Sequence, residues 1–228
     1  MKALLYKEFK LAMHPICYVF VFAFPFMILI PSYPIAIGFI YVLSCYPILF
    51  LGANKGQQSN DLLFSTLLPV RKKDIVLARI ITVIIMQVTF MLLMSALVPL
   101  AYYIQESIKA GGGEVENAGI GLNGFVSILA IVIVGYALAD LIFFPIYYKN
   151  GKSIVMSTLF TILGFIVYLL VLTIALPFIP GCEGYVNALS NVHIGIQFIY
   201  LAAAIVISFL IHILVYKISA KRLERVDF

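Results

Sequence analysis

The chain has 228 residues, of which 64% are hydrophobic and 11% are charged, and its mean hydropathy is +1.11. Soluble domains carry roughly 25% charged residues, so these values exclude an ordinary soluble domain and indicate an integral membrane protein. The net charge of +5 does not indicate nucleic-acid binding, because the distribution of the basic residues fits a membrane orientation signal better.

The first 14 residues form an amphipathic segment. Its apolar residues recur at helical spacing: Met1, Leu4, Leu5, Phe9, Ala12 and Met13. Its charged residues lie elsewhere on the helix: Lys2, Lys7, Glu8 and Lys10. We expect an interfacial helix over residues 1–14, with its lysines facing anionic lipid or a protein partner. The alternative is a simple positive anchor for the first membrane span.

Six apolar stretches are long enough to cross a bilayer, which takes about 20 helical residues. The first of them form a long uncharged run between Lys10 and Lys55, which turn-forming residues at 31–34 divide into two spans. The predicted spans cover residues 16–31, 34–53, 77–104, 122–148, 153–180 and 195–217. The sequence therefore predicts an all-α integral membrane protein with six transmembrane helices in one domain, residues 1–228.

The basic residues predict the orientation, because Lys and Arg near span ends are retained on the cytoplasmic side. With both termini in the cytoplasm, only Lys109 of the 15 basic residues lies outside. The outer loops carry acidic residues instead: Glu106, Glu114, Glu116 and Glu183. We expect a multi-pass protein of the cell membrane with both ends inside.

The sequence shows no constellation of catalytic or metal-ligating residues. The histidines His14, His193 and His212 are scattered, and no nucleophile lies beside a base. A G-x-G-x-x-G pattern at 119–124 lies in an outer loop, where no strand precedes it as nucleotide binding requires. We expect no enzymatic activity, no metal and no cofactor on this chain.

Asp140 is the one acid inside a predicted span. Leaving it unpaired there would cost about 2.5 to 3.5 kcal/mol, so it should face protein or water. It is either a structural partner for a basic group or a helix terminus, or a polar element of a translocation path. His212, inside the sixth span, is interpreted as a packed or hydrogen-bonded residue rather than a proton relay.

The longest cytoplasmic loop contains a second short helix, between spans 2 and 3. Residues 61–68 are rich in apolar side chains, and Pro69 ends the helix that they favour. We predict a helix over residues 59–69, held outside the membrane and suited to a groove on a soluble partner. The alternative is a helix that lies idle on the bilayer surface.

Three segments resemble permeases of the ABC-2 type exporter family. Asp61-Leu-Leu-Phe-Ser-Thr-Leu-Leu-Pro-Val-Arg-Lys-Lys-Asp-Ile-Val-Leu-Ala-Arg79 is similar to the family pattern acidic, apolar, Ser-Leu-Pro-Val-x-Arg-x-x-Ile-Val-x-x-Lys. Phe144-Pro-Ile-Tyr-Tyr-Lys-Asn-Gly151 and the start Met1-Lys-Ala-Leu-Leu-Tyr-Lys-Glu-Phe9 resemble the branch that contains bacterial peptide-toxin (phenol-soluble modulin) exporters. The chain departs from the family at Asp61, where Glu is common, and at Arg71, where Ser is common.

The resemblance implies a membrane subunit that pairs with a second copy or a sister permease and recruits cytoplasmic ABC ATPase subunits. ATP and Mg²⁺ would bind to the ATPase partner. The helix over 59–69 would be the coupling helix, with the helix over 1–14 beside it. The implied ATPase-docking residues are Asp61, Leu63, Phe64, Leu67, Leu68, Lys7 and Glu8. The cargo would be amphipathic or hydrophobic, with peptides favoured.

Two other function classes compete with this interpretation. An ion-coupled secondary carrier would use Asp140, although such carriers carry inverted repeats and several buried charges. A membrane-embedded enzyme would need the catalytic constellation that the sequence lacks. Co-transcription with an ATPase gene would separate the exporter from both alternatives.

Overall fold

The computed structural model describes residues 2–30, 70–113, 122–150, 154–175 and 194–225. Every regular element in these ranges is a helix. Among the described residues, four helices are long and apolar enough to cross a membrane: α6 (Lys72–Ala110), α7 (Phe125–Asn150), α8 (Ile154–Ala175) and α10 (Ile194–Glu224). The all-α membrane class is thus confirmed. The six-span count stays a prediction, because the second span (34–53) and the coupling helix (59–69) lie outside the described residues.

The chain begins with short helical elements. The helix α1 (Lys2–Lys7) continues as the π-helical turn η1 (Glu8–Ala12), and α2 (Ile16–Ala23) continues as the 3₁₀ helix η2 (Phe24–Leu29). Pro25 lies at the start of η2 and has no N–H to donate to an α-helical hydrogen bond. The region of the predicted first span, 16–31, is therefore an α-helix followed by a tighter 3₁₀ segment.

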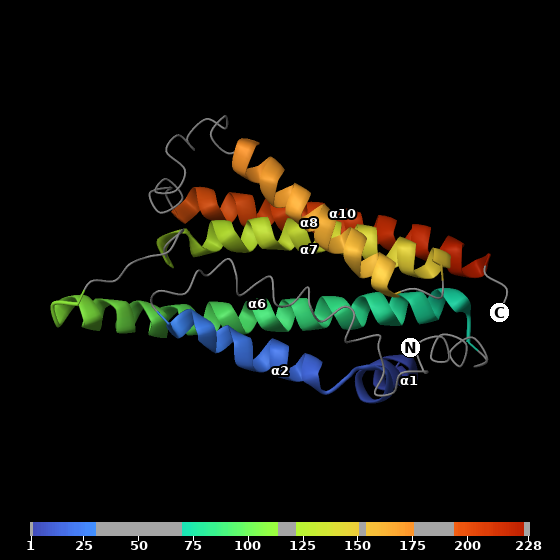
Figure 1. Ribbon diagram of the computed structural model, residues 1–228, viewed down its shortest axis with the longest axis horizontal. Coiled ribbons are helices and arrows are strands. Elements are labelled where there is room, and N and C mark those ends of the chain that lie inside the picture. Colours follow the sequence, from blue (N-terminus) through green and yellow to red (C-terminus); the bar gives the residue numbers. More distant parts are fainter. Residues whose placement is uncertain (1, 31–69, 114–121, 151–153, 176–193, 226–228) are drawn as a thin grey trace.

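The long helices run in alternating directions, so their ends gather at two opposite ends of the molecule (Figure 1). Both chain termini lie at the end where α6 begins and α10 ends. The helix α7 packs most extensively against α10 and also against α8, whereas α6 contacts α10 and the N-terminal elements. This arrangement brings together the basic residues at the start of α6 and at the ends of α7 and α10.

The helix α6 is longer than its predicted span of 77–104. Its 39 residues extend for about 58 Å at 1.5 Å per residue, whereas the hydrocarbon core of a bilayer is about 30 Å thick. It ends at Gly111 and Gly112, and Gly112 has a φ of +80°, a conformation that glycine favours. The helix therefore projects beyond the membrane core, and its start lies next to the predicted coupling helix in the sequence.

The contact between α7 and α8 depends on a small residue. A Cβ atom on Gly135 would lie 2.8 Å from Cε2 of Phe165 and 3.1 Å from Cε1 of Tyr168. The hydroxyl of Tyr168 donates a hydrogen bond of 2.9 Å to the carbonyl oxygen of Ile131, one turn before Gly135. The absence of a side chain at Gly135 therefore lets α7 and α8 approach closely at this point.

We predict that Gly135→Val lowers the free energy of unfolding by about 1–3 kcal/mol, because two aromatic rings must move to make room. Gly195→Val is the matched control, since nothing lies within 4 Å of a Cβ at that position. Denaturant titration of the detergent-purified variants measures both values. Equal effects at the two positions would show that the α7–α8 contact does not limit stability.

Candidate functional site

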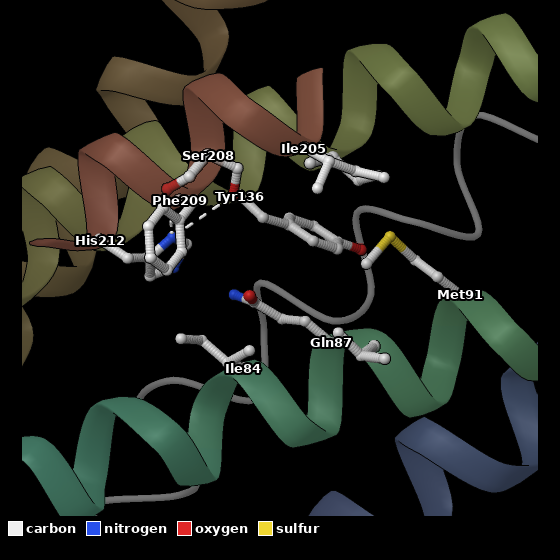
Figure 2. Close-up of a pocket in the computed structure, with 10 residues that line it drawn as sticks. Ile84, Gln87, Met91, Tyr136, Ile205, Ser208, Phe209 and His212 are labelled. Carbon is white, nitrogen blue, oxygen red and sulfur yellow. Dashed lines mark hydrogen bonds between the residues drawn. The ribbon is translucent and has the colours of Figure 1, made fainter. Parts of the chain in front are cut away.

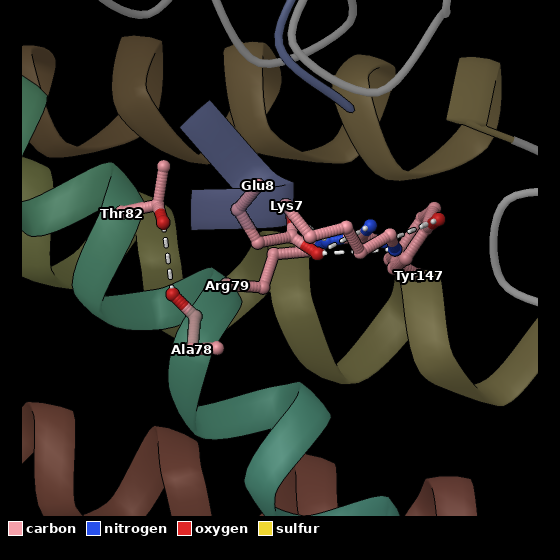
Figure 3. Close-up of polar contacts among 6 residues, drawn as sticks. All are labelled: Lys7, Glu8, Ala78, Arg79, Thr82 and Tyr147. Carbon is pink, nitrogen blue, oxygen red and sulfur yellow. Dashed lines mark hydrogen bonds and ion pairs between the residues drawn. The ribbon is translucent and has the colours of Figure 1, made fainter. Parts of the chain in front are cut away.

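One cluster of buried charges joins the N-terminal segment to α6 and α7 (Figure 3). We call Lys7, Glu8, Arg79 and Tyr147 the Arg79 cluster. The guanidinium of Arg79 binds both carboxylate oxygens of Glu8, with Nε at 2.9 Å from Oε2 and Nη2 at 3.2 Å from Oε1. Its Nη1 donates to the hydroxyl of Tyr147 at 3.3 Å, and Nζ of Lys7 lies 3.4 Å from Oε1 of Glu8.

The Arg79 cluster is buried by the helices around it. The side chains of Arg79 and Glu8 are 0% and 1% exposed, and Lys7 is also buried. A charge at such a depth is tolerated only when it is paired and hydrogen-bonded. The guanidinium of Arg79 meets both conditions, because it pairs with the carboxylate through two parallel hydrogen bonds and still has a donor for Tyr147. The cluster therefore fixes α1 and η1 against the first turns of α6 and the last turn of α7.

A second cluster lies deeper, between α6, α7 and α10. We call Gln87, Asp140, Ser208 and His212 the Asp140 cluster. Oδ2 of Asp140 accepts from Nε2 of Gln87 at 3.3 Å and lies 3.0 Å from Nε2 of His212. Nδ1 of His212 lies 2.7 Å from the carbonyl oxygen of Ser208. Asp140 is fully buried, as an acid within a span requires.

Both ring nitrogens of His212 have polar neighbours. Nδ1 lies 2.7 Å from the carbonyl oxygen and 3.3 Å from the hydroxyl of Ser208, one turn earlier on α10. Nε2 faces Oδ2 of Asp140 on α7. The contact therefore joins α10 to α7 and gives the buried acid a polar partner within the span.

A third set of contacts ties α10 to its neighbours at the same end of the molecule as the Arg79 cluster. Nζ of Lys73 lies 3.3 Å from Oε1 of Glu224, which joins the start of α6 to the end of α10. Nη1 of Arg222 donates to the carbonyl oxygen of Pro145 at 2.6 Å, which joins α10 to α7. At this end of the molecule, polar contacts thus join α10 to both α6 and α7.

The structure places only some of the predicted site residues. Five predicted docking residues lie outside the described part of the chain: Asp61, Leu63, Phe64, Leu67 and Leu68. Lys7 and Glu8 were expected to face lipid or a partner, but they are buried in the Arg79 cluster. Their role in docking an ATPase stays a prediction.

Sequence reasoning missed most partners in the two clusters. From the sequence, Arg79 was read as a positive charge that sets orientation and as the last residue of one family motif, and Tyr147 as part of another motif. Gln87 offered a signal, because it is an amide within a predicted span. Among the described residues, no group of three or more His, Cys, Asp or Glu side chains is arranged to hold a metal ion.

We predict that Arg79→Met lowers the free energy of unfolding by about 3 kcal/mol, because it leaves the Glu8 carboxylate buried without its guanidinium. The double variant Glu8→Gln/Arg79→Met should recover part of this loss. Arg71→Met is the matched control, since the Arg71 side chain is 87% exposed and such ion pairs contribute little. Denaturant titration in detergent measures all three, and similar losses in Arg71→Met and Arg79→Met would contradict the assignment.

Comparison with known proteins identifies the family of the chain. No curated protein and no solved structure matches the chain significantly. A family model described as ABC-2 family transporter protein matches residues 3–223, which include the Arg79 cluster, the Asp140 cluster and the four long helices up to the last turn of α10. The chain therefore belongs to the ABC-2 family of transporter proteins, as a multi-pass membrane permease that works with ABC ATPase subunits and is not itself catalytic.

Proposed function

We propose that the chain is the membrane-spanning subunit of an ATP-driven exporter that moves amphipathic peptides out of the cytoplasm. A separate ATPase binds ATP and Mg²⁺ and docks on the coupling helix at residues 59–69. The permease acts as a pair, with a second copy or a sister permease in the membrane. The single observation that best supports this proposal is the position of the Arg79 cluster near the start of α6.

The Arg79 cluster provides a path for movement from the ATPase. The helix α6 begins at Lys72, three residues after the predicted coupling helix ends. Arg79 lies two turns further along and binds Glu8 of the N-terminal segment and Tyr147 of α7. A displacement of the coupling helix would therefore move α6, the N-terminal segment and α7 together. In this scheme Lys7 and Glu8 act by holding the N-terminal segment against α6.

ATP would drive transport by stabilising one of two arrangements of the paired permeases. ATP binding closes the ATPase pair and moves the coupling helices, and hydrolysis resets them. The extensive packing of α10 on α7, with the hydrogen bond from Arg222 to Pro145, would make α10 follow α7 and α6. The cytoplasmic ends of three helices would then tilt as one body.

Exposed apolar side chains support both the membrane location and an apolar cargo path. Large apolar residues are exposed along α8 and α10, including Leu163, Leu170, Ile199, Phe209 and Leu210. Lipid, a second permease or an apolar cargo would each cover such surfaces. The assignment of the cargo as peptide rests on the resemblance of residues 144–151 and 1–9 to the peptide-toxin exporter branch.

We predict that Leu67→Asp reduces attachment of the partner ABC ATPase by at least about tenfold, as expected for a residue central to an interface. A charge there would have to be desolvated in an apolar groove. Asp61→Lys should weaken attachment in the same assay. Co-purification of the tagged permease from membranes measures the ATPase that is retained.

Ser107→Asp is the control, because Ser107 is exposed at the far end of α6 and the change introduces the same charge. Unchanged ATPase recovery with Leu67→Asp would count against the coupling helix. A well-folded wild-type permease that retains no ATPase would overturn the exporter proposal and favour the ion-coupled carrier, for which the contact between Asp140 and His212 is the supporting observation.

A further inference from the structure

A pocket of about 250 Å³ lies between α6, α7 and α10, within the part of the chain that would cross the membrane (Figure 2). Gln87 and Tyr136 line it and are 4% and 1% exposed, so they form its floor. Val88, Ile205 and Phe209 also line it and are 42%, 53% and 66% exposed, so they form its mouth. The pocket thus has a polar floor and an apolar mouth that opens to the side of the helices.

The chemistry of the floor selects for a polar but uncharged group. The amide of Gln87 points into the pocket (Figure 2), and an amide both donates and accepts hydrogen bonds. His212 also lines the pocket, with its Nε2 at 3.0 Å from Oδ2 of Asp140. Among the described residues that line the pocket, none is Asp, Glu, Lys or Arg. A charged ligand group would therefore find no such side chain to pair with, at a depth where an unpaired charge is costly.

The size and the mouth define the rest of the ligand. The volume of about 250 Å³ is below the roughly 300–1,000 Å³ of pockets that hold drug-sized ligands. The side chains at the mouth are apolar and exposed within helices that are apolar enough to cross a membrane, so a ligand dissolved in the bilayer could place its apolar part against them.

We propose that this pocket binds a small uncharged amphiphile, with its hydroxyl or amide group at Gln87 and its apolar body at the mouth. The site lies within one permease subunit and its three helices. It does not depend on the exporter proposal, because the permease alone contains every residue that it uses.

The test uses tryptophan fluorescence, which is specific here because the chain contains no Trp. Phe209→Trp places the reporter at the mouth and replaces one aromatic ring by another. Ile207→Trp is the matched control, since Ile207 is also exposed but does not line the pocket. The two positions are two residues apart on α10, so their side chains point in nearly opposite directions, about 160° apart, and differ in depth by only about 3 Å.

The full-length variants are reconstituted in phosphatidylcholine vesicles and titrated with bromooctanol, whose bromine quenches nearby tryptophan. We expect saturable quenching of Phe209→Trp and unsaturated quenching, from partition into the bilayer alone, of Ile207→Trp. Equal, unsaturated quenching of both variants would overturn the proposal. If Phe209→Trp does not fold, Val88→Trp reports from the α6 side of the same mouth.

Matched probes test the chemistry of the floor. Bromooctane lacks the hydroxyl, and bromooctanoate is charged. The membrane concentration that gives half-saturation should therefore be about fivefold higher for each of them than for bromooctanol, which is the effect of one hydrogen bond. Adding Gln87→Met to Phe209→Trp should abolish the advantage of bromooctanol over bromooctane. Equal binding of bromooctanoate, or an advantage that survives Gln87→Met, would overturn the assignment of the floor.

Discussion

The buried contact between Arg79 and Glu8 is the constraint on which one end of this permease depends. A guanidinium and a carboxylate cannot be buried among apolar helices unless they bind each other and their remaining hydrogen-bonding groups are satisfied. Arg79 meets this condition with both oxygens of Glu8 and with the hydroxyl of Tyr147. The N-terminal segment, α6 and α7 therefore have one mutual arrangement at this end of the molecule.

The charges of the Asp140 cluster are paired in the same way about 10–12 Å deeper. This depth follows from the rise of an α-helix over the eight-residue step from Arg79 to Gln87 and the seven-residue step from Asp140 to Tyr147. There α10 replaces the N-terminal segment as the third partner, through His212. The two clusters thus hold α6 and α7 together at two depths, and each adds a different third element. A pair of helices held in this way moves as a unit, which suits a part that passes movement from a cytoplasmic partner into the membrane.

The sequence predicts the class of this fold because composition and apolar length are local properties. It predicts much less about the clusters, since Glu8 and Arg79 are 71 residues apart and Asp140 and His212 are 72 residues apart. The prediction of an amphipathic helix over residues 1–14 used 3.6 residues per turn. Residues Glu8–Ala12 instead form a π-helical turn, which rotates the side chains that follow it relative to that prediction. The helix α6 extends past both ends of the predicted span of 77–104, because charged turns continue the helix beyond the apolar stretch. That Asp140 needs a partner was predictable from its cost in the membrane, but the identity of that partner depends on how α7 packs on α10.

If this permease is an ATP-driven exporter, an ATPase docks beside the start of α6 and its movement enters the membrane there. Photo-cross-linking in intact membranes tests this docking, with a photoreactive amino acid at Leu67 and, as control, at Tyr103, which is 71% exposed toward the far end of α6. We expect a cross-linked ATPase from position 67 and none from position 103. Cross-linking from neither position, or equally from both, would contradict it.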